Sequence, residues 1–460
     1  MSIAEELAAR IAAPGGPDLP QRALDNAKVV ILDTLGCALA GASQPVVETL
    51  LRTPGLVQPG PASLIGRGER LAPLDAALVN GVAAHALDFD DVNMAMGGHP
   101  SAPILPALFA LVEAAPPQMR APVSGRDFLC AFITGFETET RLARSVNFHH
   151  YEKGWHPTAT LGVFAAAAAC SRLLGLPPGQ IAMALGLAAS LACGIKANFG
   201  TMTKPFHIGN CTRNGLMCAL LAGQGFTSSL VAFEHKQGFF NVFNGPGTYR
   251  PELATANWAA PLDIVEPGIG IKLYPCCDST HAAIDGLFML KNQNDFSVSD
   301  VEEIDVLVHP LRLPHVNRPQ IRSALDAKFS IQYCLARALL DGHIVLDSFA
   351  ESAYRDPRIP GLMARVHAAP HPDLSQASEG NYLTDLTLHL SGGRTLHQHM
   401  DRPHGRRADE PPPRELLLRK FDNCATKALT AENAEALRKI VSTLEDVPDM
   451  TEVCRLFRAR

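Results

Sequence analysis

Apolar residues recur at helical spacing through most of the first 265 residues. The clearest case is residues 20–41, where Ala23, Ala27, Val30 and Leu35 fall on one face of a helix. Similar spacing predicts further helices at residues 4–12, 74–88, 103–115, 125–144, 157–174, 178–195, 210–223 and 229–233. Several of them begin at proline or just after serine or threonine, as helix N-termini commonly do. The pattern therefore predicts one large helical domain.

The pattern changes to alternation near residue 300. Residues 303–309 and 386–390 alternate with period two and predict strands. Residues 391–393 predict a turn into a further strand at 394–400. Helices are expected between and beside these strands, at residues 282–290 and 327–340. This part of the chain is typical of a smaller α+β domain.

The two patterns set the predicted domain boundaries. Residues 402–413 are rich in Pro, Arg and Gly and predict a linker, which is followed by helices at 414–421 and 431–445. We therefore expect a mainly α protein. Residues 1–268 and 405–460 would form a large all-helical domain, and residues 269–404 the smaller α+β domain.

Composition and charge exclude several classes of protein. The 460 residues carry 40 Lys and Arg against 46 Asp and Glu, and the net charge of -6 argues against a nucleic-acid-binding surface. Eleven cysteines without a CxxC pair predict free thiols in a reducing compartment. The N-terminal residues do not read as a signal peptide, and the apolar runs 158–170 and 181–195 are too short to span a bilayer. We expect a cytoplasmic protein with no nucleic-acid or membrane partner.

Polar residues gather where the helix from residue 74 is predicted to end and the next helix to begin. Asp88 lies near a helix C-terminus, where the helix dipole disfavours an anion, so the carboxylate needs a partner or a chemical task. Ser101 begins the next helix, whose free N–H groups could hold a carboxylate, and His99 lies just before it. A polar interhelical loop with caps is the alternative interpretation.

A second polar segment, residues 151–158, opens the Ala-rich helix. His156 would lie at its N-terminus, where the dipole disfavours the imidazolium and keeps a neutral base available. A purely structural hydrogen bond at the helix entry is equally compatible with this position. His149 and His150, just upstream, are expected at the surface.

Two lysines stand in similar polar surroundings. Lys204, between small polar residues and a proline before an apolar helix, suits an anionic group, although most lysines are simply solvated. Lys272 lies in residues 268–281, at the predicted domain junction, where binding sites are common. Leu273 takes the third glycine position of a GxGxxG motif, so a dinucleotide site is weakly indicated. Lysines for carboxylates and histidines for proton transfer together suit a small polyanion.

Taken in order, these segments resemble the MmgE/PrpD family. The matching residues are Asp33–Gly36, Asp88–Asp91, Gly98–Ser101, Gly154–Thr158, Thr203–Gly209, Lys272–Cys276 with His281, and Phe329–Tyr333. The resemblance implies a large helical domain with a smaller α+β lid, a site between them, a homodimer, and no metal or organic cofactor. It also implies the catalytic residues Asp88, His99, His156, Lys204, Lys272 and Tyr333. Residues expected to bind substrate are Ser101, Tyr151, His207, Cys277 and His281.

The family includes 2-methylcitrate dehydratases, iminodisuccinate epimerases and cis-aconitate decarboxylases. Val92 and Cys277 stand where decarboxylases tend to carry Thr and His, and Tyr151 could be the extra acid/base of an epimerase. The loop of residues 92–98 also differs from the longer polar loop of 2-methylcitrate dehydratases. We expect a dehydratase of a citrate-like substrate first, with the epimerase and then the decarboxylase as alternatives.

The resemblance predicts removal of a proton next to a carboxylate of a small di- or tricarboxylate. Lys204 and Lys272 would stabilise the developing charge, and closure of the lid would exclude water. His99 or His156 would be the base, and Asp88 would fix the tautomer of a histidine. Tyr333 or the second histidine would return the proton.

Two other classes of function compete with this interpretation. A metal-dependent hydrolase could be built on His85, Asp88, Asp90, Asp91 and His99. A helical scaffold that only binds small carboxylates is the second, and it would show binding without turnover.

Overall fold

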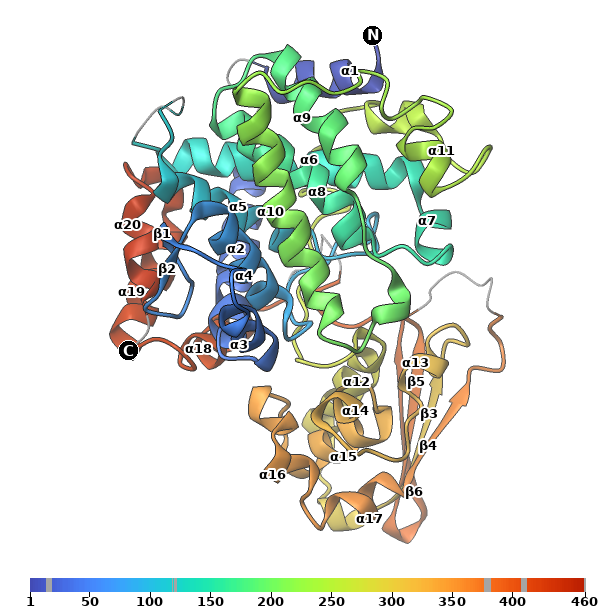
Figure 1. The fold of residues 1–460 in the computed structure, drawn as a ribbon. Coiled ribbons are helices and arrows are strands. Elements are labelled where there is room, and N and C mark those ends of the chain that lie inside the picture. The colour runs from blue at the N-terminus through green and yellow to red at the C-terminus, as the bar shows by residue number, and fades with distance from the viewer. Residues whose placement is uncertain (14–18, 118, 120–121, 376–381, 407–411, 459–460) are drawn as a thin grey trace. The chain divides into compact units, whose positions relative to one another are not determined.

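The computed structural model describes the chain except for residues 14–18, 118, 120–121, 376–381, 407–411 and 459–460 (Figure 1). The chain divides into two compact units, one of residues 1–271 with 417–460 and the other of residues 272–416. Helix accounts for 56% of the structure and strand for 9%, which confirms the prediction of a mainly α protein with a minor sheet region.

The second unit extends past the boundary that the sequence placed at residue 405. Residues 405–416 are grouped with the smaller unit, in which Arg406 pairs with Asp278 and the backbone of His404 donates to Asp285. These two contacts tie His404 and Arg406 to the smaller unit. Residues 407–411 of the predicted linker lie outside the described residues.

The larger unit is built mainly of helices. They are α1 (Ile3–Ile11), α2 (Gln21–Gly41), α3 (Pro45–Arg52), α4 (Pro73–His85), α5 (Ser101–Ala114), α6 (Gly125–Val146), α7 (His149–Glu152), α8 (Pro157–Leu173), α9 (Pro178–Leu191), α10 (Thr203–Gly223), α11 (Phe239–Phe243), most of α18 (Arg414–Ala425), α19 (Ala431–Ser442) and α20 (Thr451–Cys454). A short antiparallel pair, β1 (Pro59–Ser63) and β2 (Arg70–Leu71), is an addition to the predicted all-helical domain.

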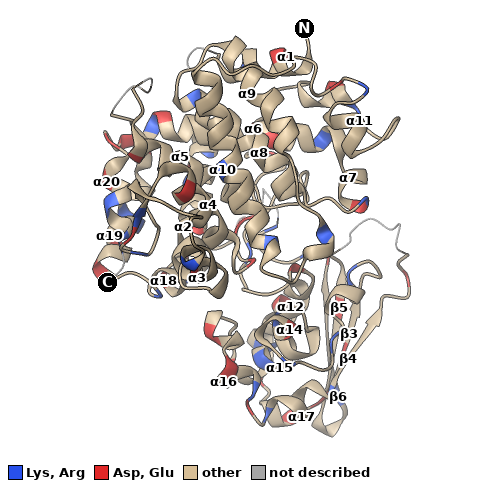
Figure 2. Ribbon diagram, in the orientation of Figure 1, with Lys and Arg blue, Asp and Glu red and all other residues tan. Residues whose placement is uncertain are grey.

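Helix α8 lies at the centre of this unit and is buried along residues 157–171. It packs against α5, α6, α9 and α10. Its Ala-rich sequence allows these neighbours to approach closely, and α9 carries no charged side chain at all. Both helices are therefore almost entirely tan in Figure 2, where charged residues are coloured.

Helices α4 and α10 cross in close contact at a pair of glycines. A Cβ on Gly81 of α4 would lie 2.9 Å from the Cα of Gly209 of α10, and a Cβ on Gly209 would lie 2.2 Å from the carbonyl oxygen of Leu78. Only glycine permits backbones to come this near. His85 ends α4 one turn after Gly81, and Lys204 lies in the first turn of α10. The crossing therefore brings the C-terminal end of α4 beside the N-terminal end of α10.

The structure corrects three predicted elements of the larger unit. Residues 229–233 form turns and irregular structure rather than a helix. Helix α4 ends at His85 instead of residue 88, since Asp88 has a φ of 53°, in the left-handed region. Helix α10 begins at Thr203 instead of residue 210, with Pro205 in its first turn, where proline is tolerated.

The smaller unit is built on one sheet with the strand order β4–β3–β5–β6. The strands are β3 (Val301–Val308), β4 (Val366–Pro370), β5 (Thr384–Leu390) and β6 (Arg394–Met400). Strand β3 runs antiparallel to β5 and parallel to β4, and β5 runs antiparallel to β6. The predicted strands at 303–309, 386–390 and 394–400 are thus present.

One face of this sheet is covered by α12 (His281–Gln293) and α15 (Ile331–Asp341). Alternate residues of β5 are buried, as period-two patterning requires. The remaining helices are α13 (Leu313–Val316), α14 (Ala324–Lys328), α16 (Glu351–Tyr354) and α17 (Ile359–Met363). The helix predicted at 327–340 is divided between α14 and α15, because Ser330 caps a new helix through its side chain.

Among the described residues, no single helix has both the length and the hydropathy of a membrane span. Helices α2 and α3 meet both criteria when taken together, but they are bent by 69° at their junction.

Candidate functional site

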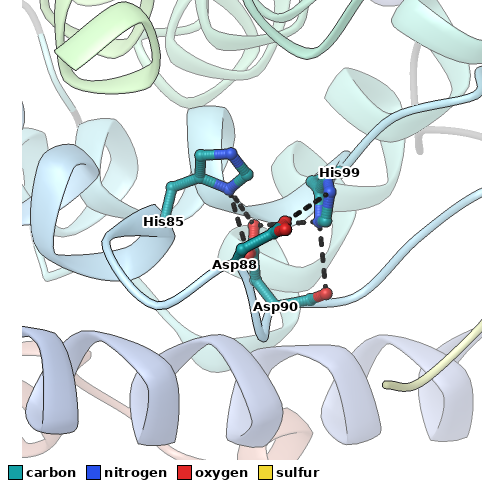
Figure 3. A group of neighbouring side chains, drawn as sticks. All are labelled: His85, Asp88, Asp90 and His99. Atoms are coloured by element: carbon teal, nitrogen blue, oxygen red, sulfur yellow. Dashed lines mark hydrogen bonds and ion pairs between the residues drawn. The ribbon is translucent and has the colours of Figure 1, made fainter. Parts of the chain in front are cut away.

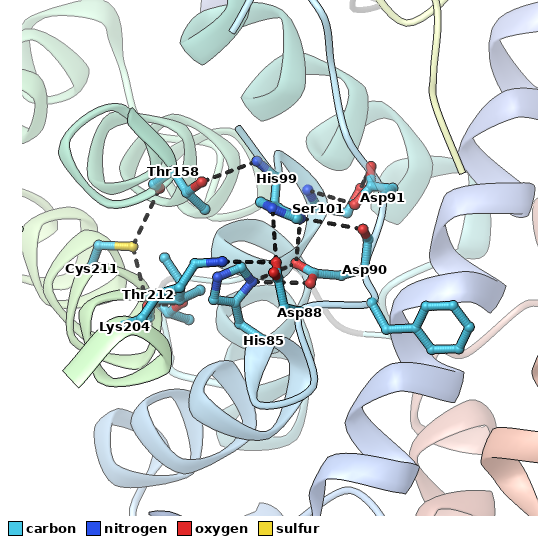
Figure 4. Close-up of polar contacts among 12 residues, drawn as sticks. His85, Asp88, Asp90, Asp91, His99, Ser101, Thr158, Lys204, Cys211 and Thr212 are labelled. Atoms are coloured by element: carbon cyan, nitrogen blue, oxygen red, sulfur yellow. Dashed lines mark hydrogen bonds and ion pairs between the residues drawn. The ribbon is translucent and has the colours of Figure 1, made fainter. Parts of the chain in front are cut away.

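A polar cluster lies where three helix ends of the larger unit meet. Its residues come from the end of α4, the loop after it, and the starts of α8 and α10. They are His85, Asp88, Asp90, His99, His156, Lys204 and His207. Figure 4 shows His85, Asp88, Asp90, His99 and Lys204 pointing toward one another. The glycine crossing of α4 and α10 is what allows groups so distant in sequence to meet.

Asp88 and Lys204 form the most direct contact in the cluster. Lys204 Nζ lies 2.8 Å from Asp88 Oδ1, and His99 Nε2 lies 3.4 Å from the same oxygen. The ammonium also lies 5.0 Å from the centre of the Phe199 ring, a distance that allows a cation–π contact. The prediction that the Asp88 carboxylate needs a partner is met by this ammonium.

Asp90 is fully buried. Figure 3 shows its contacts with the imidazoles of His85 and His99. Its carboxylate oxygens lie 2.9 and 3.0 Å from His85 Nδ1, and Oδ2 lies 3.4 Å from His99 Nδ1. Burial alone would raise the pKa of this carboxyl, but the neighbouring His85 and His99 outweigh it and lower the pKa to about 2. Asp90 is therefore an anion in the interior of the protein.

Four histidines follow one another through the cluster. The ring centres of His85 and His99 are 4.7 Å apart, those of His85 and His156 5.8 Å, and those of His156 and His207 5.5 Å. Burial lowers the pKa of His99 to about 4 and lowers that of His156 well below its usual range. At neutral pH these two imidazoles are therefore uncharged and can accept a proton.

Two family domains match the sequence. Residues 5–252 match the MmgE/PrpD N-terminal domain, and residues 274–446 match the MmgE/PrpD C-terminal domain. The chain belongs to the MmgE/PrpD family. The resemblance drawn from the motifs is thereby confirmed.

Several MmgE/PrpD enzymes are similar along nearly their whole length. The cis-aconitate decarboxylase of Homo sapiens is 33% identical over 469 residues, which cover 99% of this chain and 95% of that protein. The cis-aconitate decarboxylase of Aspergillus terreus is 29% identical over 460 residues, covering 96% and 92%. The 2-methylcitrate dehydratase of Cupriavidus necator is 26% identical over 440 residues, covering 90% and 88%. These relatives are lyases.

The site residues predicted for this family member fall into two groups. Asp88, His99, His156, Lys204 and His207 come together in the larger unit. Sequence reasoning considered His85 and Asp90 only as metal ligands, yet they are the innermost members of the cluster. Their spacing from Asp88 on the same loop was the available signal. The sequence did not show that the helix ends at residue 85 and that the following loop folds back on itself.

Three other predicted positions in the larger unit have structural partners. Ser101 is buried, its Oγ lies 2.7 Å from Asp91 Oδ2, and its backbone N–H donates to the same carboxyl, so the N-terminus of α5 is held by the chain's own acid. Lys196 Nζ lies 3.3 Å from the centre of the Tyr151 ring. His150, expected at the surface, is fully buried between Asn244 and Thr160.

The remaining predicted residues belong to the smaller unit. Burial would raise the pKa of Asp278, but Arg406, His281 and Lys272 around it lower that pKa. Cys277 is half-buried, and its backbone N–H donates to the carbonyl of Lys328.

Tyr333 lies in the hydrophobic core of the smaller unit. It is fully buried, and its hydroxyl donates to the carbonyl of Ser348. Because that donor already has an intramolecular acceptor, we assign no chemical step to Tyr333.

The cluster also has the composition of a metal site. One ligand atom from each of His85, Asp88, Asp90 and His99 lies within 4.8 Å of the others, and two imidazoles with two carboxylates suit a divalent transition metal. Asp91 points away toward Ser101 and is not part of this group. Lys204, however, already places a positive charge 2.8 Å from Asp88, so an ion bound there would have to displace the ammonium or repel it.

The buried imidazoles predict a stability change in mild acid. His99 and His150 have pKa values of about 4 in the folded protein, whereas unfolded histidine titrates near 6.5. The unfolded chain therefore binds more protons between these pH values, and the free energy of unfolding falls as the pH falls. From pH 6.5 to 5 we expect a loss of about 1.5 kcal/mol for each imidazole. Burial raises the pKa values of Asp91 and Glu139, which act in the opposite direction, so urea unfolding of the wild type is compared with that of His150→Asn at the two pH values. The same pH dependence in both proteins would contradict the assignment for His150.

Proposed function

We propose that the protein is a lyase that transfers a proton at a carbon next to a carboxylate of a small tricarboxylate. The observation that carries this proposal is the meeting of one ammonium, Lys204, with the neutral imidazoles of His99 and His156 in a buried cluster. Such protons are weakly acidic, and their removal needs both a base and a positive charge that stabilises the resulting dianion. The cluster supplies both from side chains alone.

His99 is the better candidate for the base. Its Nε2 lies near the Asp88–Lys204 pair, where a substrate carboxylate would meet the ammonium, whereas its Nδ1 faces Asp90. Proton removal by Nε2 leaves the electron pair delocalised into the carboxylate. The His99 imidazolium formed in this way would then give its proton to the departing hydroxyl, which leaves as water, because His156 is uncharged and has no proton that it can readily release. Lys272 stays a predicted second ammonium, in the other unit.

Decarboxylation is the second candidate within this class. The relatives at 33% and 29% identity are cis-aconitate decarboxylases, whereas Val92 and Cys277 depart from the residues expected of that activity. In that reaction the bond from carbon to a carboxyl group breaks, CO₂ leaves, and the carbon is protonated. The sequence identity to decarboxylases therefore supports decarboxylation more strongly than the motifs alone did. Epimerisation is supported only by Tyr151, which could serve as the additional acid/base that an epimerase needs.

A panel of substrates separates these activities. Purified protein is incubated with citrate, 2-methylcitrate and cis-aconitate, and the products are identified by NMR together with released CO₂. Dehydration of a hydroxy acid supports the first candidate, and CO₂ release from cis-aconitate supports the second. A chelator arm tests the metal-dependent alternative, since chelator-sensitive turnover with a stoichiometric metal would favour it. Binding of all three without any product would favour a carboxylate-binding scaffold and would contradict the proposal.

A further inference from the structure

The acidic loop of the larger unit holds two adjacent aspartates that face different partners. Asp90 contacts His85 and His99, whereas Asp91 contacts the side chain and backbone of Ser101. Figure 4 shows Asp90 beside His85 and Asp91 beside Ser101. Both side chains are fully buried. The two neighbouring carboxyl groups thus contact different residues.

The position of Asp90 dictates the tautomers of two histidines. An ionised carboxylate can only accept hydrogen bonds, so a ring nitrogen that is hydrogen-bonded to it must carry the proton. For His85 this nitrogen is Nδ1, at 2.9 Å. In His99, Nδ1 lies 3.4 Å from the Asp90 carboxylate, and Nε2 lies 3.4 Å from the Asp88 carboxylate, which already accepts from Lys204. The Nδ1 of His99 also lies 3.2 Å from the carbonyl oxygen of Asp90, a second acceptor. In the neutral ring, Nε2 is then left as the proton acceptor.

His85 completes the arrangement from the opposite side. Its side chain is buried, and its Nε2 has no hydrogen-bond partner among the described residues. A buried acceptor without a hydrogen-bond donor lowers the stability of the protein, so another interaction of His85 must offset this cost. That interaction is the Nδ1–H bond to both oxygens of Asp90, which holds the carboxylate in place.

We infer that Asp90, held by His85, is the positioning residue that fixes His99 in the tautomer with Nε2 as the base. This assignment differs from the sequence prediction, which gave the orienting task to Asp88. Asp88 is instead bound by Lys204, and His99 presents the opposite nitrogen to it. The inference rests on the proposed proton transfer and names the group that prepares its base.

The test compares two substitutions at adjacent positions, Asp90→Asn and Asp91→Asn. Asparagine has one carbonyl oxygen in place of two carboxylate oxygens and carries no charge, so Asp90→Asn weakens the hold on the two Nδ1–H groups. We expect kcat to fall at least about a hundredfold with KM little changed. Asp91 faces Ser101 rather than the imidazoles, so Asp91→Asn should keep kcat within about threefold.

A pH profile separates positioning from a merely structural role. The charge of Asp90 raises the pKa of His99 against burial, and Asp88 acts in the same direction, whereas His85 and Lys204 act in the opposite one. In Asp90→Asn the acidic limb of kcat/KM should therefore move to lower pH. An unshifted limb with wild-type kcat in folded Asp90→Asn would overturn the inference.

Substitutions of His85 keep the test decisive if Asp90→Asn fails to fold. His85→Asn retains a side-chain N–H near the position of Nδ1, whereas His85→Leu retains none. We expect His85→Asn to keep at least ten times the kcat of His85→Leu. Equal losses in the two variants would contradict the role of the Nδ1–H bond. If the wild-type protein itself transfers no proton, the proposed function fails instead, so the two failures can be told apart.

Discussion

Replacement of His99 by asparagine should lower kcat by about 10²- to 10⁴-fold while leaving the protein folded. General base groups contribute rate factors of this size. The asparagine amide can still donate toward Asp90, so the buried carboxylate keeps a partner, but the Nε2 acceptor is lost. The variant thus removes the base and little else. Steady-state kinetics together with thermal unfolding measure the two effects separately.

His150→Asn is the matched control for this experiment. His150 is a buried histidine that bonds to Asn244 and Thr160 and belongs to no part of the proposed chemistry. We expect this variant to lose stability and to keep its turnover per folded molecule. The account of His99 would be wrong if His99→Asn lowered the melting temperature as much as His150→Asn does while retaining near-normal kcat.

Replacement of Lys204 by methionine should lower kcat/KM by about 10²- to 10³-fold or more, the loss typical of a group that stabilises developing negative charge. Methionine fills a similar volume beside the Phe199 ring but carries no charge. Because Asp88 loses its ammonium, its negative charge would also oppose a bound carboxylate. The effect should appear in both kcat and KM, measured with each member of the substrate panel.

Lys153→Met provides the corresponding control for a lost positive charge. Lys153 donates to the backbone carbonyl of Asn244, near the start of α8, and has no part in the proposed mechanism. Its kcat/KM should stay within about threefold of wild type. A comparable loss in both variants would mean that the net charge of this region, rather than the specific contact with Asp88, determines the rate.

The sequence predicted the helices well because their apolar spacing is determined locally. It also predicted Asp88, His99, His156 and Lys204 as site candidates, since each lies near a helix end, where polar residues are conspicuous. What it could not supply was the geometry between these ends, which depends on the contact of Gly81 with Gly209. For that reason the orienting role was predicted for Asp88.

Short-range patterns also misplaced groups whose surroundings are made by distant residues. His150 was predicted to be exposed because its neighbours in sequence are polar. It is buried, and it forms a hydrogen bond with Asn244, which lies far along the chain. Ser101 looked like a free helix N-terminus until Asp91 was found to occupy it. Each difference arises from a partner that periodicity does not reveal.

The most direct measurement is exchange of the substrate proton with solvent. Citrate, 2-methylcitrate and cis-aconitate are incubated with the wild-type protein in deuterated water and followed by NMR. The account predicts that deuterium enters substrate or product at a carbon next to a carboxylate for at least one of them, and that His99→Asn abolishes this. Dehydration removes the proton without adding deuterium to the product, so it is followed as loss of deuterium from substrate labelled at that carbon. Turnover with neither gain nor loss of deuterium there, or tight binding of all three with neither exchange nor product, would contradict the account.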